Sequence, residues 1–252
     1  MKGNFMIFDP TFIAIMIVGA ILGGLTQWHI KSTFKKYSKA GLSRPASGVQ
    51  VAERTLRSVN LPVADESGAV SGANAFGKKP VSIMRTAGHL SDHFDPRSNT
   101  VALSEVVYDK SNIAAAAVAA HEVGHAIQTA EAYLPGRIRS ALVPVANVGS
   151  SLSIWLIIGG FFLASTNAML GGNLMWAGII LFGAAVLFQL VTLPVEFDAS
   201  RRAMVLLRET GTLSQAELPQ ARKVLTAAAL TYVAAALIAV AQLLYWIGLA
   251  RD

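Results

Sequence analysis

The sequence predicts a mainly α-helical integral membrane protein, with four transmembrane helices and a cytoplasmic domain that contains a small β-sheet. Three observations support this prediction. The 252 residues are 53% hydrophobic and only 14% charged, which is too apolar for a soluble domain of this length. Long charge-free runs alternate with polar, basic segments. Cysteine is absent, so a disulfide framework is excluded and any metal must be bound through nitrogen and oxygen.

Three charge-free runs locate the transmembrane helices. They cover residues 10–30, 140–195 and 224–250, and a helix needs about 20 apolar residues to cross a bilayer. The middle run is long enough for two crossings, and the polar, glycine-containing stretch 165–173 is suited to a turn between them. The four predicted spans are residues 10–28, 143–165, 174–195 and 227–249.

The first span has one alternative, a cleaved signal peptide, because it lies at the N-terminus. Its apolar stretch is long for a signal core. It continues into Trp28, His29 and Lys31, which favour an anchor at the membrane interface over a cleavage site. We therefore interpret it as a span and His29 as an interfacial residue.

Basic residues orient these spans. Most of the 21 Lys and Arg residues lie in two segments, 31–139 and 201–223, and the positive-inside rule places both segments in the cytoplasm. Both termini then face outside. The same placement favours membrane orientation, rather than nucleic-acid binding, as the reason for the net charge of +6. The resulting division is a first transmembrane helix (1–30), a cytoplasmic domain (31–142), a transmembrane hairpin (143–195), a cytoplasmic helical segment (196–223) and a fourth transmembrane helix (224–252).

The cytoplasmic domain is expected to begin with a helix followed by two strands. Apolar residues at helical spacing predict a helix over 49–59, and the Gly-, Ala- and Ser-rich stretch 67–79 is expected to be a loop. Strands are expected at 81–85 and 100–104, with turn-forming residues between them. A strand exposed at the edge could hold an extended peptide.

Further helices follow. One is expected over 112–130, with Ser111 as its N-cap and residues 134–136 as its end. In the second cytoplasmic segment a helix is expected over 197–208, then a turn at 210–212, then a helix that leads into the fourth span.

The helix over 112–130 carries His121-Glu122-Val123-Gly124-His125, which matches the pattern H-E-x-x-H. Four residues advance about 400° around a helix and about 6 Å along it, so both imidazoles leave one face and can bind one zinc ion. Glu122 is placed to take a proton from a water that zinc activates and to pass it to the leaving amine. The pattern therefore indicates peptide-bond hydrolysis without a covalent intermediate. A chance match on a packing helix is the alternative, but burying these polar residues among alanines is costly without a function.

Glu196 is the candidate third ligand. It is the first charged residue after the long apolar run, and catalytic zinc sites commonly combine two histidines with a carboxylate. The structural alternative is a carboxylate that favours a helix N-terminus after Pro194. Asp198 is either an alternative ligand or an acceptor that orients a histidine. Arg201 and Arg202 are candidates to pair with these acids or with lipid phosphate.

Two further histidines, His89 and His93, lie between the expected strands. Histidines in loops are more often structural or solvated than metal ligands. For His93 we favour a position on the substrate side of the site, or behind a ligand, over a role as a ligand.

Three segments together resemble one family. Residues 119–128 around the motif, 89–104 with the core Asp-His-Phe-Asp-Pro-Arg, and 193–203 are similar to the neutral, YugP-type membrane zinc metallopeptidases of bacteria. The Phe-Asp-Pro-Thr sequence at 8–11 and the basic residues at 31–39 agree with this. The resemblance extends over nearly the whole chain and is more specific than H-E-x-x-H alone.

The resemblance implies a multi-pass protease of the bacterial plasma membrane, distantly similar to the HtpX-type membrane proteases. It also implies one Zn²⁺ per chain, held by His121, His125 and Glu196. The sequence departs from the family pattern at Phe94, where a tyrosine is expected, and the stretch 67–79 does not align with it. Neither departure affects the proposed ligands.

Other functions fit the sequence less well. A site-2-type intramembrane protease carries its motif helix inside the bilayer, whereas here Asp109 and Lys110 precede the helix and no span contains a Leu-Asp-Gly type segment. A non-proteolytic membrane scaffold that retains the zinc site would not need Glu122. A transporter is disfavoured because the predicted spans contain no ionisable residue.

The sequence thus predicts a zincin-like cytoplasmic catalytic domain attached to four spans in a lipid bilayer. Its expected partners are protein or peptide substrates, with membrane proteins suggested by its location, and nucleic acid is not expected. Oligomeric state is not indicated.

Overall fold

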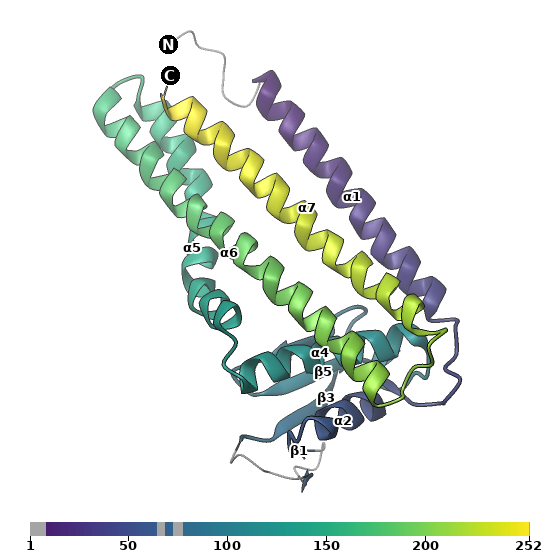
Figure 1. The fold of residues 1–252 in the computed structure, drawn as a ribbon. Coiled ribbons are helices and arrows are strands. Elements are labelled where there is room, and N and C mark those ends of the chain that lie inside the picture. The colour runs from purple at the N-terminus through teal and green to yellow at the C-terminus, as the bar shows by residue number, and fades with distance from the viewer. Residues whose placement is uncertain (1–8, 65–68, 73–77, 252) are drawn as a thin grey trace. The chain divides into compact units, whose positions relative to one another are not determined.

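The computed structural model describes residues 9–64, 69–72 and 78–251. Within them the chain is mostly helical, with a small mixed sheet (Figure 1). The elements are α1 (Pro10–Tyr37), α2 (Gly48–Ser58), β1 (Val63–Ala64), β2 (Val70–Ser71), β3 (Val81–Thr86), β4 (His93–Asp95), β5 (Thr100–Ser104), α3 (Glu105–Tyr108), α4 (Ile113–Ala130), α5 (Leu134–Leu163), α6 (Ala168–Glu209) and α7 (Leu218–Arg251).

The chain divides into two compact units. The helical unit contains the described residues up to Gln27, then Leu134–Pro194, and those from Leu230 onward. The sheet unit contains Trp28–Tyr133 and Val195–Ala229. The assignment of the predicted segments as cytoplasmic, catalytic or transmembrane domains stays a prediction.

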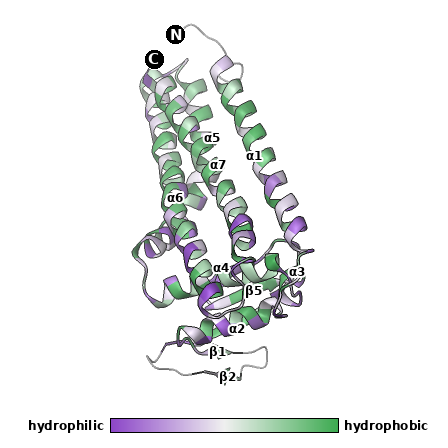
Figure 2. Cartoon of the chain, turned by 45° about the vertical axis from the view of Figure 1, so that its right-hand side comes forward, coloured by the Kyte–Doolittle hydropathy of each residue, from purple (hydrophilic) through white to green (hydrophobic). Residues whose placement is uncertain are grey.

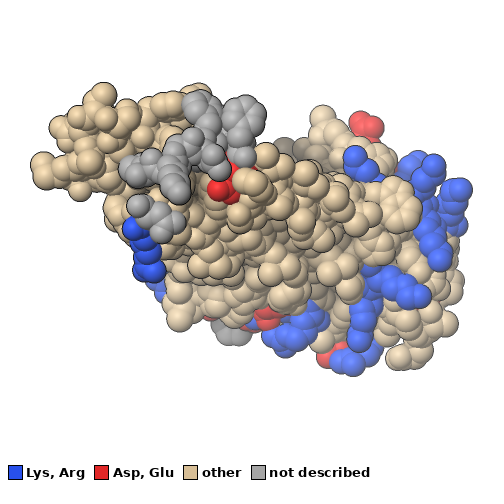
Figure 3. All heavy atoms as spheres, turned by 90° about the horizontal axis from the view of Figure 1, so that it is seen from above, with Lys and Arg blue, Asp and Glu red and all other residues tan. Residues whose placement is uncertain are grey.

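Four helices are long and apolar enough to cross a membrane: α1, α5, α6 and α7. Three of them contain a predicted span, and α5 covers the fourth, 143–165, up to Leu163. Their hydrophobic stretches are visible in Figure 2, and the face shown in Figure 3 has a broad area with few charged side chains. The prediction of four membrane-spanning helices therefore agrees with the structure in length and composition.

The turn between α5 and α6 is shorter than the sequence suggested. α6 begins at Ala168, so Gly171 lies inside a helix and not in a turn. Asn167 ends the turn by accepting a hydrogen bond from the backbone N–H of Leu170 at 3.0 Å. A Cβ on Gly160 would lie 2.6 Å from the carbonyl oxygen of Gly171, so glycine here permits two backbones to approach closely.

The sheet unit contains five strands in the order β2-β1-β3-β5-β4 among the described residues. β1, β3 and β5 are parallel, and β2 and β4 pair antiparallel at the two edges. The predicted strands correspond to β3 and β5, and the predicted helix 49–59 corresponds to α2. In the stretch expected to be a loop, Val70 and Ser71 form β2, and residues 67, 68 and 73–77 lie outside the described part.

The core of the sheet unit is built on α4. Small buried alanines line this helix, and they let it pack closely against β5 and α2. Phe94, which stands where the family pattern has tyrosine, is buried in the same core. The helix that carries the H-E-x-x-H motif, α4, is therefore held against the sheet by its buried face.

The N-cap of α4 is Asn112, not Ser111 as predicted. The side-chain oxygen of Asn112 accepts a hydrogen bond from the backbone N–H of Ala115 at 2.9 Å. The hydroxyl of Ser111 instead accepts from the backbone N–H of Ala46 at 3.0 Å. Both residues can cap a helix, and the loop that Ser111 binds decides between them.

The predicted turn after Arg208 is confirmed, since α6 ends at Glu209 and α7 begins at Leu218. Glu217 stabilises this connection. Its carboxylate accepts hydrogen bonds from the backbone N–H and hydroxyl of Ser214 and from those of Ser43, at 2.7 to 3.0 Å. Glu217 therefore joins the start of α7 to the loop that follows α1.

Candidate metal centre

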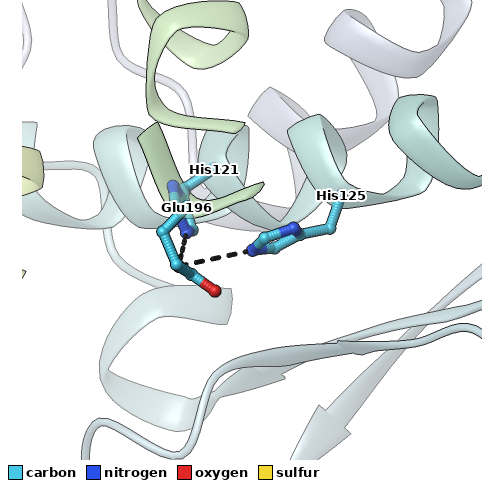
Figure 4. Close-up of side chains that lie close together, drawn as sticks. All are labelled: His121, His125 and Glu196. Carbon is cyan, nitrogen blue, oxygen red and sulfur yellow. Dashed lines mark hydrogen bonds and ion pairs between the residues drawn. The ribbon is translucent and has the colours of Figure 1, made fainter. Parts of the chain in front are cut away.

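Three side chains of the sheet unit converge on one point. His121 and His125 come from α4, and Glu196 comes from α6 (Figure 4). The Oε2 atom of Glu196 lies 3.2 Å from Nε2 of His121 and 3.7 Å from Nε2 of His125. One ligand atom from each residue lies within 4.8 Å of the others. Among the described residues, these three side chains form the group that could bind a metal ion.

Helix geometry explains why these three side chains meet. His121 and His125 are four residues apart, so their rings leave the same face of α4 with centroids 4.8 Å apart. α6 approaches that face at Gly124, where a Cβ would lie 2.6 Å from the carbonyl oxygen of Ala199. Glycine at this position therefore lets α6 come close enough for Glu196 to reach both rings.

The donor set fits zinc. Zinc binds histidine nitrogen and carboxylate oxygen at about 2.0–2.2 Å in a tetrahedron, which separates the ligand atoms by about 3.4 Å. The two measured nitrogen–oxygen distances, 3.2 and 3.7 Å, lie on either side of that value. The side chains are 13%, 13% and 5% exposed, so a metal between them would be largely shielded from water.

The second ring nitrogen of each histidine also has a partner. Nδ1 of His125 lies 3.0 Å from the side-chain oxygen of Gln128, and Nδ1 of His121 lies 3.2 Å from the hydroxyl of Ser200. Partners of this kind orient a metal-binding imidazole, and a partner that can only accept also settles which nitrogen carries its proton. Both arrangements leave Nε2 facing Glu196.

Asp198 lies outside the group of possible ligands. It accepts hydrogen bonds from Gln128 at 2.9 Å, from Arg202 at 2.6 Å, and from Arg201. Arg202 also donates to Glu131 at 2.7 Å. Of the two sequence alternatives for Asp198, the structure agrees with the acceptor, acting through Gln128. The two arginines pair with acids of the protein.

Glu122 is buried on α4 beside the two histidines. Burial raises its pKa, although the two histidines act in the opposite direction. Burial raises the pKa of Glu196, but the hydrogen bonds and charges of the two histidines outweigh this and lower it. Burial lowers the pKa of His125, but its contacts with Glu196 outweigh this and raise it.

His89 and His93 are not members of this group. The ring of His89 packs against Phe34, with centroids 5.7 Å apart, and Nδ1 of His93 lies 2.9 Å from the carbonyl oxygen of Ser91. Asp92 accepts hydrogen bonds from the backbone N–H and hydroxyl of Ser104. Burial raises the pKa of Asp92 more than these bonds lower it.

Sequence reasoning missed Gly124, Gln128 and Ser200. Gln128 could have been found, since it lies three residues after His125 on the same helix face. Ser200 and Gly124 had no comparable local signal, because their roles depend on how α4 and α6 cross.

Comparisons with known proteins agree with this chemistry. A family profile described as "Putative neutral zinc metallopeptidase" matches residues 12–251. The "Putative membrane protease YugP" of Bacillus subtilis (strain 168) is 41% identical over 236 residues, which cover 94% of this chain and 95% of that protein. No solved structure matches the chain.

Proposed function

The chain belongs to the neutral zinc metallopeptidase family, and on this premise we propose that it is a membrane-embedded zinc endopeptidase. Its single zinc ion would be held by His121, His125 and Glu196. The observation that carries the proposal is the convergence of their three ligand atoms, with Oε2 of Glu196 3.2 and 3.7 Å from the two Nε2 atoms, close to the spacing of a tetrahedral zinc site.

Glu122 is the proposed general base. When bound, zinc supplies a Lewis acid that polarises the scissile carbonyl and makes a water more acidic. Glu122 accepts the proton of that water and donates it to the leaving amine. Its raised pKa makes the carboxylate a stronger proton acceptor than an exposed glutamate.

The substrate would bind as an extended segment along β4. This strand pairs with β5 on one side and is the last strand of the sheet among the described residues. It also contacts α4, the helix that carries the motif. An edge strand offers backbone N–H and C=O groups to an added strand, so peptide sequence would matter less than an unfolded backbone.

The proposed location is the cytoplasmic face of the bacterial plasma membrane, with both termini outside. The basic segments that flank the apolar helices support this orientation. Protein or peptide substrates, including membrane proteins and damaged chains near the inner surface, follow from that location. This part fails if the purified enzyme cleaves only soluble peptides and cells lacking it accumulate no membrane-protein fragments.

The position of the motif helix counts against an intramembrane protease. α4 is absent from the helices that are long and apolar enough to cross a membrane. It packs instead against the sheet, with buried alanines on its packed face. A site-2-type mechanism would need this helix in the bilayer.

Zinc content tests the proposed site. The full chain, purified in detergent, is expected to hold about one zinc ion, and His125→Ala and Glu196→Ala are expected to lose it. Two matched controls should keep it: His29→Ala and Glu209→Ala, which remove exposed residues of the same types. A parent protein that binds no zinc after reloading would refute the peptidase proposal. Zinc binding without hydrolysis of any protein would favour a scaffold.

A further inference from the structure

Gln128 connects two of the candidate ligands. We propose that Gln128 is a positioning residue that sets the proton-bearing nitrogen of His125 and also holds the turn of α6 that carries Glu196. This inference rests on the proposed zinc site. In this proposal the neutral side chain of Gln128 positions two ligands on different helices, His125 on α4 and Glu196 on α6.

Both the nitrogen and the oxygen of the Gln128 side-chain amide have partners. The side chain is buried, with 4% of the residue exposed. Its nitrogen donates to the backbone carbonyl of Val195 at 2.8 Å and to the carboxylate of Asp198 at 2.9 Å. Its oxygen lies 3.0 Å from Nδ1 of His125. Gln128 therefore reaches from its own helix to the residue that directly precedes Glu196.

The chemistry of these partners leaves one orientation for the amide. A backbone carbonyl and a carboxylate paired with two arginines can only accept hydrogen bonds, so the NH₂ group must face Val195 and Asp198. The amide oxygen must then face His125. Because that oxygen only accepts, Nδ1 of His125 must carry a proton. Nε2, the ring nitrogen on the side of Glu196, is then the one left to bind the metal.

A chain of ion pairs anchors the far end of this network. Asp198 is bound by Arg201 and Arg202, and Arg202 also binds Glu131, the residue that follows α4. The carboxylate that restrains Gln128 is thus itself restrained from both helices. Because the Gln128 amide binds both Asp198 and His125, the position of His125 is restrained as well. The amide is neutral, so it adds no negative charge beside Glu122 and Glu196.

His121 lacks an equivalent restraint. Its Nδ1 faces the hydroxyl of Ser200 at 3.2 Å, and a hydroxyl can either donate or accept. The hydrogen bond therefore orients the ring but does not choose between its tautomers. This asymmetry provides a matched control, because Ser200→Ala removes a partner of the other histidine.

Zinc affinity and metal geometry test the proposal in the full chain purified in detergent. Gln128→Met keeps the length of the side chain but removes its hydrogen bonds, and we expect zinc affinity to fall about 10- to 100-fold in chelator competition. The absorption spectrum of the Co²⁺-loaded protein should change as well. Ser200→Ala should lower zinc affinity less than Gln128→Met. Asp198→Asn keeps an acceptor for Gln128 but loses the charge that pairs with both arginines, and should weaken zinc binding less than Glu196→Ala.

A measurement on the parent protein covers the case in which Gln128→Met does not fold. In zinc-loaded protein with ¹⁵N-labelled histidine, His125 should bind the metal through Nε2 and keep a proton on Nδ1 that exchanges slowly with water. Metal binding through Nδ1 would overturn the proposal. So would a folded Gln128→Met variant with zinc affinity within about twofold of the parent. If the parent binds no zinc at all, the proposed function falls and the role of Gln128 falls with it.

Discussion

Gly124→Ala is expected to lower zinc affinity about tenfold or more, with only a small net loss of stability. The added Cβ would lie 2.6 Å from the carbonyl oxygen of Ala199 and 3.0 Å from its Cα. Ordinary contact begins near 3.4 Å, so α4 and α6 must separate by up to about 0.8 Å. Both opposing atoms belong to the backbone, and no flexible side chain can move aside.

The expected loss of stability is the difference between an overpacking cost and a gain in helix propensity, and the expected loss of zinc affinity comes from the displacement of Glu196. Overpacking costs about 1–3 kcal/mol, and replacing glycine by alanine inside a helix returns about 1 kcal/mol. The net loss of stability is therefore small. Zinc ligands, by contrast, tolerate displacements of about 0.2 Å. Glu196 lies one turn before Ala199 and would move with it, so zinc affinity should fall about tenfold or more.

Chelator competition and thermal unfolding of the metal-free protein measure the two effects. Gly183→Ala is the control, because it places alanine in α6 where no atom lies within 4 Å of the new Cβ. That variant should keep the zinc affinity of the parent. If Gly124→Ala also keeps it, the close approach of α4 and α6 does not control the site and the reasoning is wrong.

Three further predictions concern catalysis, metal removal and pH. Glu122→Gln should retain zinc and lower the rate of peptide hydrolysis about 10²- to 10⁴-fold, as seen by metal analysis and a protease assay; loss of zinc in this variant would contradict the role of base. Removing zinc with a chelator should abolish hydrolysis and lower the melting temperature, and zinc at about 100 times its dissociation constant should restore about 2.7 kcal/mol of stability; an unchanged melting temperature would argue against a site that is part of the fold. Glu217→Gln should destabilise the protein by about 1–3 kcal/mol at pH 7. Burial raises the pKa of Glu217, but the hydrogen bonds from Ser214 and Ser43 outweigh this and lower it, so its contribution is present above the unfolded-state value of about 4.3 and is lost as pH falls through the folded-state pKa. The melting temperatures of parent and variant should therefore converge in acid, and a gap that is equal at pH 7 and in acid would refute this.

Local patterns were sufficient for the spans and for the histidine pair. A run of about 20 apolar residues predicts a membrane helix by itself. Lipid surrounds its apolar side chains, and the helix makes its own backbone hydrogen bonds, so no other part of the protein is needed. The spacing of His121 and His125 likewise places both rings on one face of any helix. Neither inference needs to know what packs nearby.

Two errors show where local patterns fail. Ser111 and Asn112 are adjacent and both are good caps, and the contact between Ser111 and the backbone of Ala46 leaves the cap to Asn112. Gly171 was expected in a turn, but it lies in α6, where its missing side chain admits the backbone of α5. The sequence alone does not distinguish a glycine in a turn from a glycine at a close contact between helices. The packing of the neighbouring helix decides which role it has.

By itself, the sequence determined the membrane helices, the helix that carries H-E-x-x-H and the chemistry that this motif can support. The sequence favoured Glu196 as the third ligand and left Asp198 as an alternative, and only the tertiary structure decided between them. Glu196 and Asp198 are two residues apart, so they point about 200° apart around α6 and cannot both face the same pair of rings. The crossing at Gly124 turns Glu196 toward the histidines and leaves Asp198 to Gln128. That choice depends on the packing of two helices about 70 residues apart in the chain, and no local pattern encodes it.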